Sequence, residues 1–169
     1  MSLTLYEATV PSFLRHLNAL SLLIEKAEAY AAEKKFPEEA LLRARLFPDM
    51  YDFAGQVRAA TDQAGGGAAR VANVPVPAFP DTEASCAELR ARIARTIAFL
   101  ETIKPGQLEG RENVEVTFPM GAAKGSMKGQ DYLIGFVVPH FYFHCTTAYG
   151  LLRHNGLAVG KRDFFGPAR

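Results

Sequence analysis

Two histidines, His140 and His144, lie four residues apart in the segment PHFYFH at 139–144. On a helix this spacing brings their Cβ atoms to about 5 to 6 Å from each other, and two imidazole nitrogens about 2.0 to 2.1 Å from one zinc ion fit that separation. The pair therefore predicts a divalent-metal site. Two neutral histidines bonded to oxygen atoms of the protein interior are the alternative. Phe141 stands where an HExxH motif needs glutamate, so the zinc-protease motif is excluded.

The third ligand of such a site is the open question. A catalytic zinc ion usually takes three protein ligands and leaves one position free. Asp49 is the first choice, because it opens a predicted helix after a proline and shares a face with Gln56. Its alternative role is that of a helix N-cap. Asp52, Gln56 and His16 are the other candidates for the third ligand.

The histidines belong to the last predicted helix, from Gln130-Asp131 to Asn155-Gly156. Steps of three and four residues place seven of its side chains on one stripe. The stripe consists of Leu133, Val137, His140, His144, Thr147, Leu151 and His154. Both histidines are therefore expected on the seam that faces the interior of the protein.

Apolar stripes predict two helices in the first half of the chain. The first is expected to start at Pro11, because proline is tolerated in the first turn of a helix but not in its interior. The second is expected to start at Asp49 and to end at the three glycines at 65–67, with the short segment EEALLRAR before it as a separate helical turn.

A third helix is expected after the proline-stiffened connection at 73–80. Asp81 or Thr82 is its predicted N-cap, and it is expected to run about six turns to the stop signal at 104–106. The segment VEVTF then alternates with period two and is followed by turn residues, which predicts a small β-hairpin. The tail at 159–169 is expected to pack back onto the protein, since its two phenylalanines would otherwise be exposed together.

The predicted elements indicate an all-α fold, a four-helix bundle with a small β-hairpin before the last helix. A length of 169 residues with 49% hydrophobic composition suits one domain over residues 1–169. The segment MSLTLYEATVPSF lacks the basic-then-apolar pattern of a secretion signal, and no apolar run reaches about 20 residues, so we expect a cytoplasmic protein that does not enter the membrane. The net charge of +1 argues against nucleic acid as a partner. Cys86 and Cys145 are expected to be buried thiols.

The segments PDMYDFAGQV, DYLIGFVVPHFYFHCTTAYGLLRHNG and GKRDFFG carry a family resemblance. With them the chain resembles, over nearly its whole length, the DinB/YfiT-like superfamily, and in particular a branch known only as a domain of unknown function. The resemblance implies a bundle that holds a divalent metal through one histidine of the second helix and two of the last. His140 and His144 match the last-helix pair. No histidine lies between Pro48 and Ala64, where Asp49 or Gln56 is the nearest polar substitute.

Two functions follow from these features. The first is a small-molecule enzyme, similar to thiol transferases or hydrolases, that depends on one zinc or nickel ion held by His140, His144 and Asp49. The alternative is a metal-free homodimeric binding or structural module with a degenerate metal site. The surplus of aromatic side chains on the last helix favours a subunit interface. These side chains are Phe136, Phe141, Phe143 and Tyr149.

Overall fold

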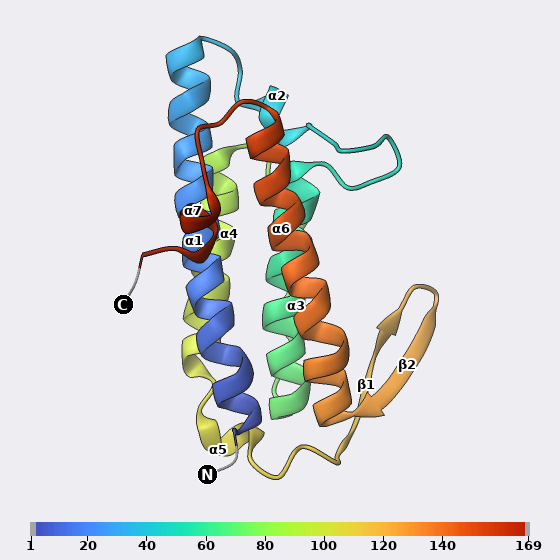
Figure 1. Ribbon diagram of the computed structural model, residues 1–169. Helices are drawn as coiled ribbons and strands as arrows, with labels where there is room; N and C mark the ends of the chain where they lie inside the picture. The colour runs from blue at the N-terminus through green and yellow to red at the C-terminus, as the bar shows by residue number, and fades with distance from the viewer. Residues whose placement is uncertain (1–2, 168–169) are drawn as a thin grey trace.

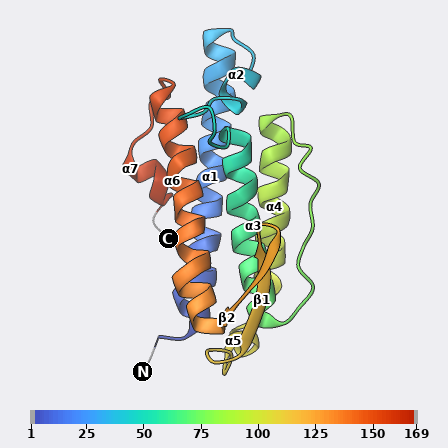
Figure 2. The same cartoon turned by 90° about the vertical axis from the view of Figure 1, so that its right-hand side faces the viewer.

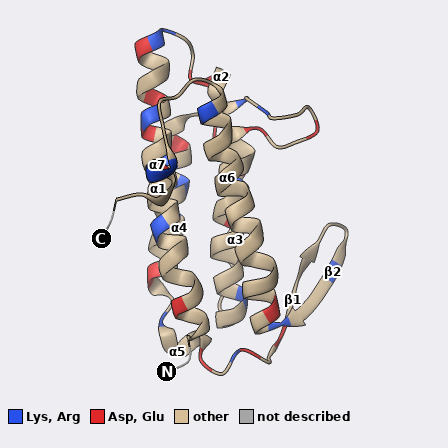
Figure 3. Ribbon diagram, in the orientation of Figure 1, with Lys and Arg blue, Asp and Glu red and all other residues tan. Residues whose placement is uncertain are grey.

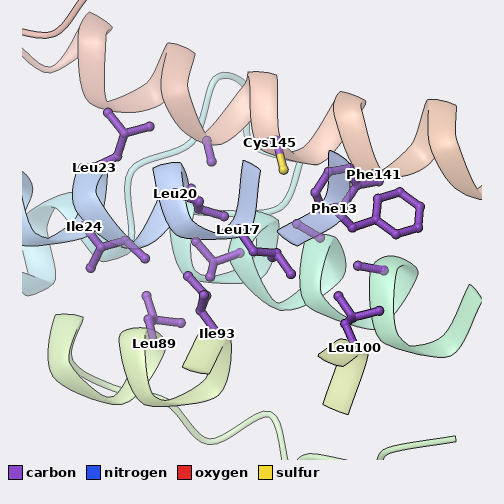
Figure 4. Close-up of a cluster of buried hydrophobic side chains, with 14 of the residues drawn as sticks. Phe13, Leu17, Leu20, Leu23, Ile24, Leu89, Ile93, Leu100, Phe141 and Cys145 are labelled. Atoms are coloured by element: carbon purple, nitrogen blue, oxygen red, sulfur yellow. The ribbon is translucent and has the colours of Figure 1, made fainter. Parts of the chain in front are cut away.

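Four long helices lie side by side in the computed structural model, which describes residues 3–167 (Figure 1). They are α1 (Leu5–Lys34), α3 (Phe53–Ala72), α4 (Cys86–Thr102) and α6 (Val138–His154). Helices α1 and α6 run in one direction and α3 and α4 in the other, so the connection at 73–85 must return along the outside of the bundle (Figure 2). The apolar stripes of all four helices meet in one core cluster (Figure 4). The predicted bundle is confirmed.

Shorter elements join and cover these helices. They are α2 (Glu39–Leu42), α5 (Pro105–Leu108), β1 (Glu115–Met120), β2 (Ala123–Lys128), the π-helix η1 (Asp131–Val137) and α7 (Lys161–Phe165). The two antiparallel strands pair from Glu115 with Lys128 to Met120 with Ala123, which leaves a two-residue turn. Gly121 has φ of +60° in this turn, a conformation that suits glycine. The predicted hairpin is therefore confirmed, and its Phe118 packs 4.6 Å from the ring of Tyr132 in η1.

The helix starts differ from the predicted ones because other residues provide the caps. Helix α1 begins at Leu5, with Thr4 and Glu7 forming a reciprocal capping box, so Pro11 lies inside the helix instead of starting it. Helix α3 begins at Phe53, because Asp52 and not Asp49 caps it: the Asp52 carboxylate accepts the N–H of the third helical residue at 2.8 Å.

The glycines at 65–67 do not end α3, which continues to Ala72 and stops where Asn73 takes a left-handed conformation. These glycines are buried and serve close packing. A Cβ atom on Gly67 would lie only 2.4 Å from Cγ1 of Val137 in η1. The missing side chain thus lets α3 and η1 approach each other, and this packing offsets the weak helix propensity of glycine.

Helix α4 has 17 residues and is shorter than predicted, because Ser85 caps it instead of Asp81 or Thr82. The Ser85 hydroxyl accepts the N–H of Glu88 at 3.1 Å. Asp81 is engaged elsewhere, with its carboxylate 2.9 Å from Nη1 of Arg92.

The last helical segment contains a wide turn that the sequence pattern did not predict. Residues 131–137 form the π-helix η1, in which the Val138 N–H reaches back five residues to the carbonyl of Leu133. Pro139 lies next in the chain and has no N–H to give to the carbonyl four residues earlier. A widened turn immediately before proline is the response of the helix to that missing bond.

The tail returns to the bundle as predicted, with α7 packed against α1 (Figure 1). Phe164 is half-buried there and Phe165 is more exposed, while residues 168–169 of the tail lie outside the described part of the chain. Cys86 and Cys145 are both buried free thiols. Within residues 3–167, no helix combines the length and the apolar character needed to cross a membrane.

Candidate functional site

The two histidines lie on the outer edge of α6 and not on its buried face. The buried side chains of α6 include Phe141 and Cys145, which point into the core in Figure 4, whereas His140 is exposed and His144 is half-buried. The predicted inward position is therefore wrong for His140 and only partly met by His144. From Val137 the buried stripe continues by a step of four to Phe141, whose ring packs 4.8 Å from that of Phe13.

His144 is joined to α3 through Gln56, a fully buried residue of the first turns of that helix. Nδ1 of His144 lies 2.8 Å from Oε1 of Gln56, and Nε2 of Gln56 donates to the backbone carbonyl of Tyr51 at 3.2 Å. Since a carbonyl only accepts, the amide nitrogen of Gln56 must face Tyr51 and its oxygen must face His144. Nδ1 of His144 therefore carries the proton, and Nε2 keeps its lone pair.

The surroundings of His144 keep this imidazole neutral and leave Nε2 accessible. Burial lowers the pKa of His144, and the positive charge that His140 can carry one helical turn away lowers it further. Nε2 of His144 has no hydrogen-bond partner among residues 3–167 and is not buried. On the neighbouring turn, the exposed ring of His140 packs 4.2 Å from that of Phe136.

An aromatic residue before α3 completes the surroundings of His144. The ring of Tyr51 stacks 6.2 Å from that of His144, at an angle of 25°. Sequence reasoning missed Tyr51, which has no catalytic spacing of its own and gains its place only because the next residue, Asp52, caps α3. Helix α6 itself carries a single charged residue, Arg153, so the charges near the site come from other elements (Figure 3).

Tyr51 also lines a cleft of about 350 Å³, within the size range of small-molecule sites. Its charged lining consists of Arg43, Arg45, Arg58, Asp52, Asp62 and Asp81. Three positive and three negative groups balance, so the cleft suits polar molecules of low net charge. Tyr51 lines this cleft and also contacts His144, so one side chain joins the cleft to the imidazole.

The candidate third ligands are dispersed. Asp49 is exposed in the loop before α3, and the carboxylate of Asp52 is engaged by its own helix and by Arg43 at 3.3 Å. His16 packs against Tyr142, on the opposite side of α6 from the other two histidines. Of the four candidates, only Gln56 contacts His144 directly.

The donor set does not fit the three-ligand site of a catalytic zinc ion. His140 and His144 offer two Nε2 atoms, and the amide oxygen of Gln56 is already bound to Nδ1 of His144. Between residues 3 and 167, no group of three His, Cys, Asp or Glu side chains is arranged to hold a metal. Gln56 instead takes the position of an orienting partner that fixes one imidazole tautomer.

The two cysteines do not offer an alternative nucleophile. Burial raises the pKa of the Cys145 thiol, and burial together with the carboxylate of Glu38 raises the pKa of the Cys86 thiol to about 12. A thiol must lose its proton to react, so both remain in their unreactive form near neutral pH.

Comparison with known proteins gives a family and a structural relative. A family model described as "Domain of unknown function (DUF1993)" matches residues 5–165. A crystal structure of a DinB family member protein from Shewanella denitrificans at 1.83 Å resolution is 37% identical, with a TM-score of 0.90, and the match covers 97% of this chain and 93% of that chain. No curated protein matches the sequence.

Proposed function

Because the chain belongs to the DUF1993 family and is DinB-like in fold, we propose that it is a small-molecule enzyme whose general base is His144, at the seam between α3 and α6. The observation that carries this proposal is the chain of two hydrogen bonds from His144 through Gln56 to the carbonyl of Tyr51. It holds a neutral imidazole with one nitrogen fixed and the other free. A base with this arrangement can take a proton from water or from a thiol.

The proposed chemistry uses the residues of the chain alone. Nε2 of His144 accepts the proton of the attacking water or thiol while the oxygen or sulfur atom bonds to a carbonyl carbon of the substrate and the π electrons of the carbonyl move to its oxygen. When the carbonyl re-forms, the bond from its carbon to the leaving group breaks, and the leaving group departs with that electron pair and with the proton that the imidazole returns. Gln56 keeps the imidazole oriented and accepts the hydrogen bond from Nδ1 before and after proton transfer. Tyr51 forms the wall between the imidazole and the adjoining cleft, where the rest of the substrate is bound.

Substitution of His144 tests the proposal, with p-nitrophenyl acetate as the probe. The ester is cleaved either by water alone or by the thiol of added cysteine. We expect His144→Ala to lower kcat/KM by about 100-fold or more, since a positioned base contributes about 10² to 10⁴ in rate. Gln56→Leu is expected to lower kcat with less effect on KM, because the imidazole loses its fixed tautomer. In the unmodified protein the rate is expected to fall only below about pH 6.5, because the lowered pKa keeps the base neutral above that pH.

Two controls accompany this assay. His154→Ala removes an exposed histidine at the other end of α6 and should leave the rate unchanged. Metal binding by His140 and His144 stays a prediction, so the same assay is run after chelation with EDTA and after addition of zinc or nickel. A rate that disappears on chelation and returns with metal would favour the metal-dependent enzyme over the proposed one. If His144→Ala had the same rate as the parent protein, both the metal-dependent enzyme and the enzyme with His144 as general base would be excluded.

A second candidate function is a dimeric binding module, and a specific observation favours it. Tyr51 and Phe143 flank His144 and are 60% and 55% exposed, and Phe47 in the loop before α3 is 64% exposed. Exposed aromatic side chains such as those on both sides of His144 are typical of an interface. We expect light scattering at micromolar concentration to give the mass of a dimer.

The interface residues can be tested one at a time. Phe143→Ser is expected to shift the dimer to a monomer, since buried aromatic residues contribute most to binding at interfaces. Leu22→Ser is the matched control, because Leu22 is 44% exposed on α1, away from this face, and should not change the mass. A monomer in the unmodified protein would rule out this second function and leave the enzymatic proposal untouched.

A further inference from the structure

We propose that α7 is a pH-sensitive cover, which stays closed over His16 while that imidazole is neutral and opens when the imidazole takes up a proton. His16 lies on α1 and is only 7% exposed. Its Nδ1 is 2.9 Å from the carbonyl oxygen of Ser12. Since that oxygen only accepts, Nδ1 carries the proton and Nε2 is left with a lone pair. Nε2 is buried, and within residues 3–167 it has no hydrogen-bond partner.

Aromatic rings surround this unpartnered nitrogen, two of them on α7. The ring of His16 lies 4.9 Å from that of Tyr142 on α6, 5.3 Å from that of Phe164 and 6.2 Å from that of Phe165. A protonated Nε2 would carry a donor and a positive charge into this environment with no acceptor to receive it. Water can reach the nitrogen only if one of the surrounding elements moves.

Helix α7 is the element most able to move. It has five residues, too few to be stable alone, and none of its side chains is fully buried. A groove of about 790 Å³ already lies between α7 and α1, lined by residues that include Leu22 and Phe165. Opening separates the rings of Phe164 and Phe165 from His16 and the ring of Phe164 from Tyr149, without exposing a fully buried side chain of α7.

The charged groups around His16 leave its protonation uncompensated. On α1, Arg15 repels a second positive charge and donates to the carbonyl of Phe165 at 2.8 Å. The carboxylate of Asp163 on α7 is bound to Lys26 and to the N–H of Gly160. The other ionisable groups of α7 are Lys161 and Arg162, and those of α6 that contact His16 or Phe164 are Tyr142 and Tyr149. None of these provides a free carboxylate.

The direction of the pH effect follows from these surroundings. Burial lowers the pKa of His16, Arg15 lowers it further, and the bond to Ser12 opposes both effects. In the open state the imidazole is hydrated and titrates near its usual value of about 6.5. Below that pH the open state therefore binds more protons than the closed state, and the closed state loses stability relative to the open state as the pH falls. The pKa of Asp163 is lowered by Lys26 and Gly160, so its ion pair persists through this range.

Hydrogen exchange followed by NMR on the full chain tests the cover. The amides of Asp163 and Gly166 form hydrogen bonds within α7 and report its closure. After correction for the intrinsic rate, their protection is expected to fall about tenfold for each pH unit below about 6.5, while the amides of the central turns of α1 stay protected. Protection that is independent of pH in the unmodified protein would overturn the proposal.

Variants separate His16 from the other histidines. His16→Leu fills the same space without a titrating group, and its protection at Asp163 and Gly166 should no longer depend on pH. His154→Gln removes an exposed histidine and should behave as the parent. A pH-dependent loss that persists in His16→Leu would contradict the proposal. If that variant does not fold, an NMR titration of the His16 ring in the unmodified protein tests the proposal instead. The pKa of His16 is expected to lie below the usual value for histidine, and a pKa at the usual value would overturn the proposal.

Discussion

Arg92→Met is expected to lower the free energy of unfolding by about 3 to 5 kcal/mol, the usual cost of breaking a buried ion pair. Arg92 is fully buried. Its guanidinium lies 2.6 Å from the carboxylate of Asp62, 2.9 Å from that of Asp81 and 3.0 Å from that of Glu83. Glu83 is itself buried, so the substitution leaves its charge in the interior with Arg58 as the remaining partner.

Urea denaturation followed by circular dichroism measures this effect. Arg90→Met is the matched control two residues earlier on α4, because Arg90 forms a single ion pair with Glu28 at 2.8 Å, with both side chains partly exposed. Its expected cost is below about 1 kcal/mol. Equal losses in the two variants would show that the buried cluster contributes no more than a surface pair.

Gly67→Ala is expected to lower the free energy of unfolding by about 1 to 3 kcal/mol, although alanine is the better helix former. The added Cβ would lie 2.4, 2.9 and 3.2 Å from the Cγ1, Cγ2 and Cβ atoms of Val137. Val137 is fully buried and cannot turn away. The two helical segments must therefore separate, which loosens the packing next to the histidine-bearing turns of α6. Thermal unfolding measures the change.

The neighbouring glycine provides the matched control. A Cβ on Gly66 would meet Nη1 of Arg70 at 2.7 Å, the flexible end of a long side chain, and Val76 at an ordinary 3.6 Å. Gly66→Ala is therefore expected to be neutral or to stabilise the protein by up to about 1 kcal/mol. If Gly66→Ala proved as destabilising as Gly67→Ala, the close approach to Val137 would not be the cause.

The fold could be predicted because apolar stripes and turn residues are local signals. The bundle, the hairpin and the returning tail all follow from spacing along the chain. The predicted helix starts were less accurate, because several residues near the start of each helix are able to cap it. Asp49 and Asp52 are chemically equal as caps, and only the packing of the loop selects the second.

The spacing of residues on the last helix does not decide which side chains after Val137 face the core. After Val137, a step of three leads to His140 and a step of four leads to Phe141, and both steps are helical. Phe141 packs against Phe13 in the core, and as a result both histidines lie at the edge of the buried face of α6. Gln56 was a candidate from the sequence, but its bond to Nδ1 of His144 joins residues 88 positions apart and has no local signal.

The wide turn η1 lies between the hairpin and the histidine-bearing turns of α6. The hairpin is anchored on η1 through Phe118 and Tyr132, and both histidines lie after its end. Each residue of a helix advances the chain by about 100° around the axis. Loss of one residue from α6 before His140 would therefore rotate both histidines by roughly a quarter of a circle relative to the hairpin, whereas η1, whose bonds span five residues, holds one residue more than an α-helical turn and can lose it while that angle is kept.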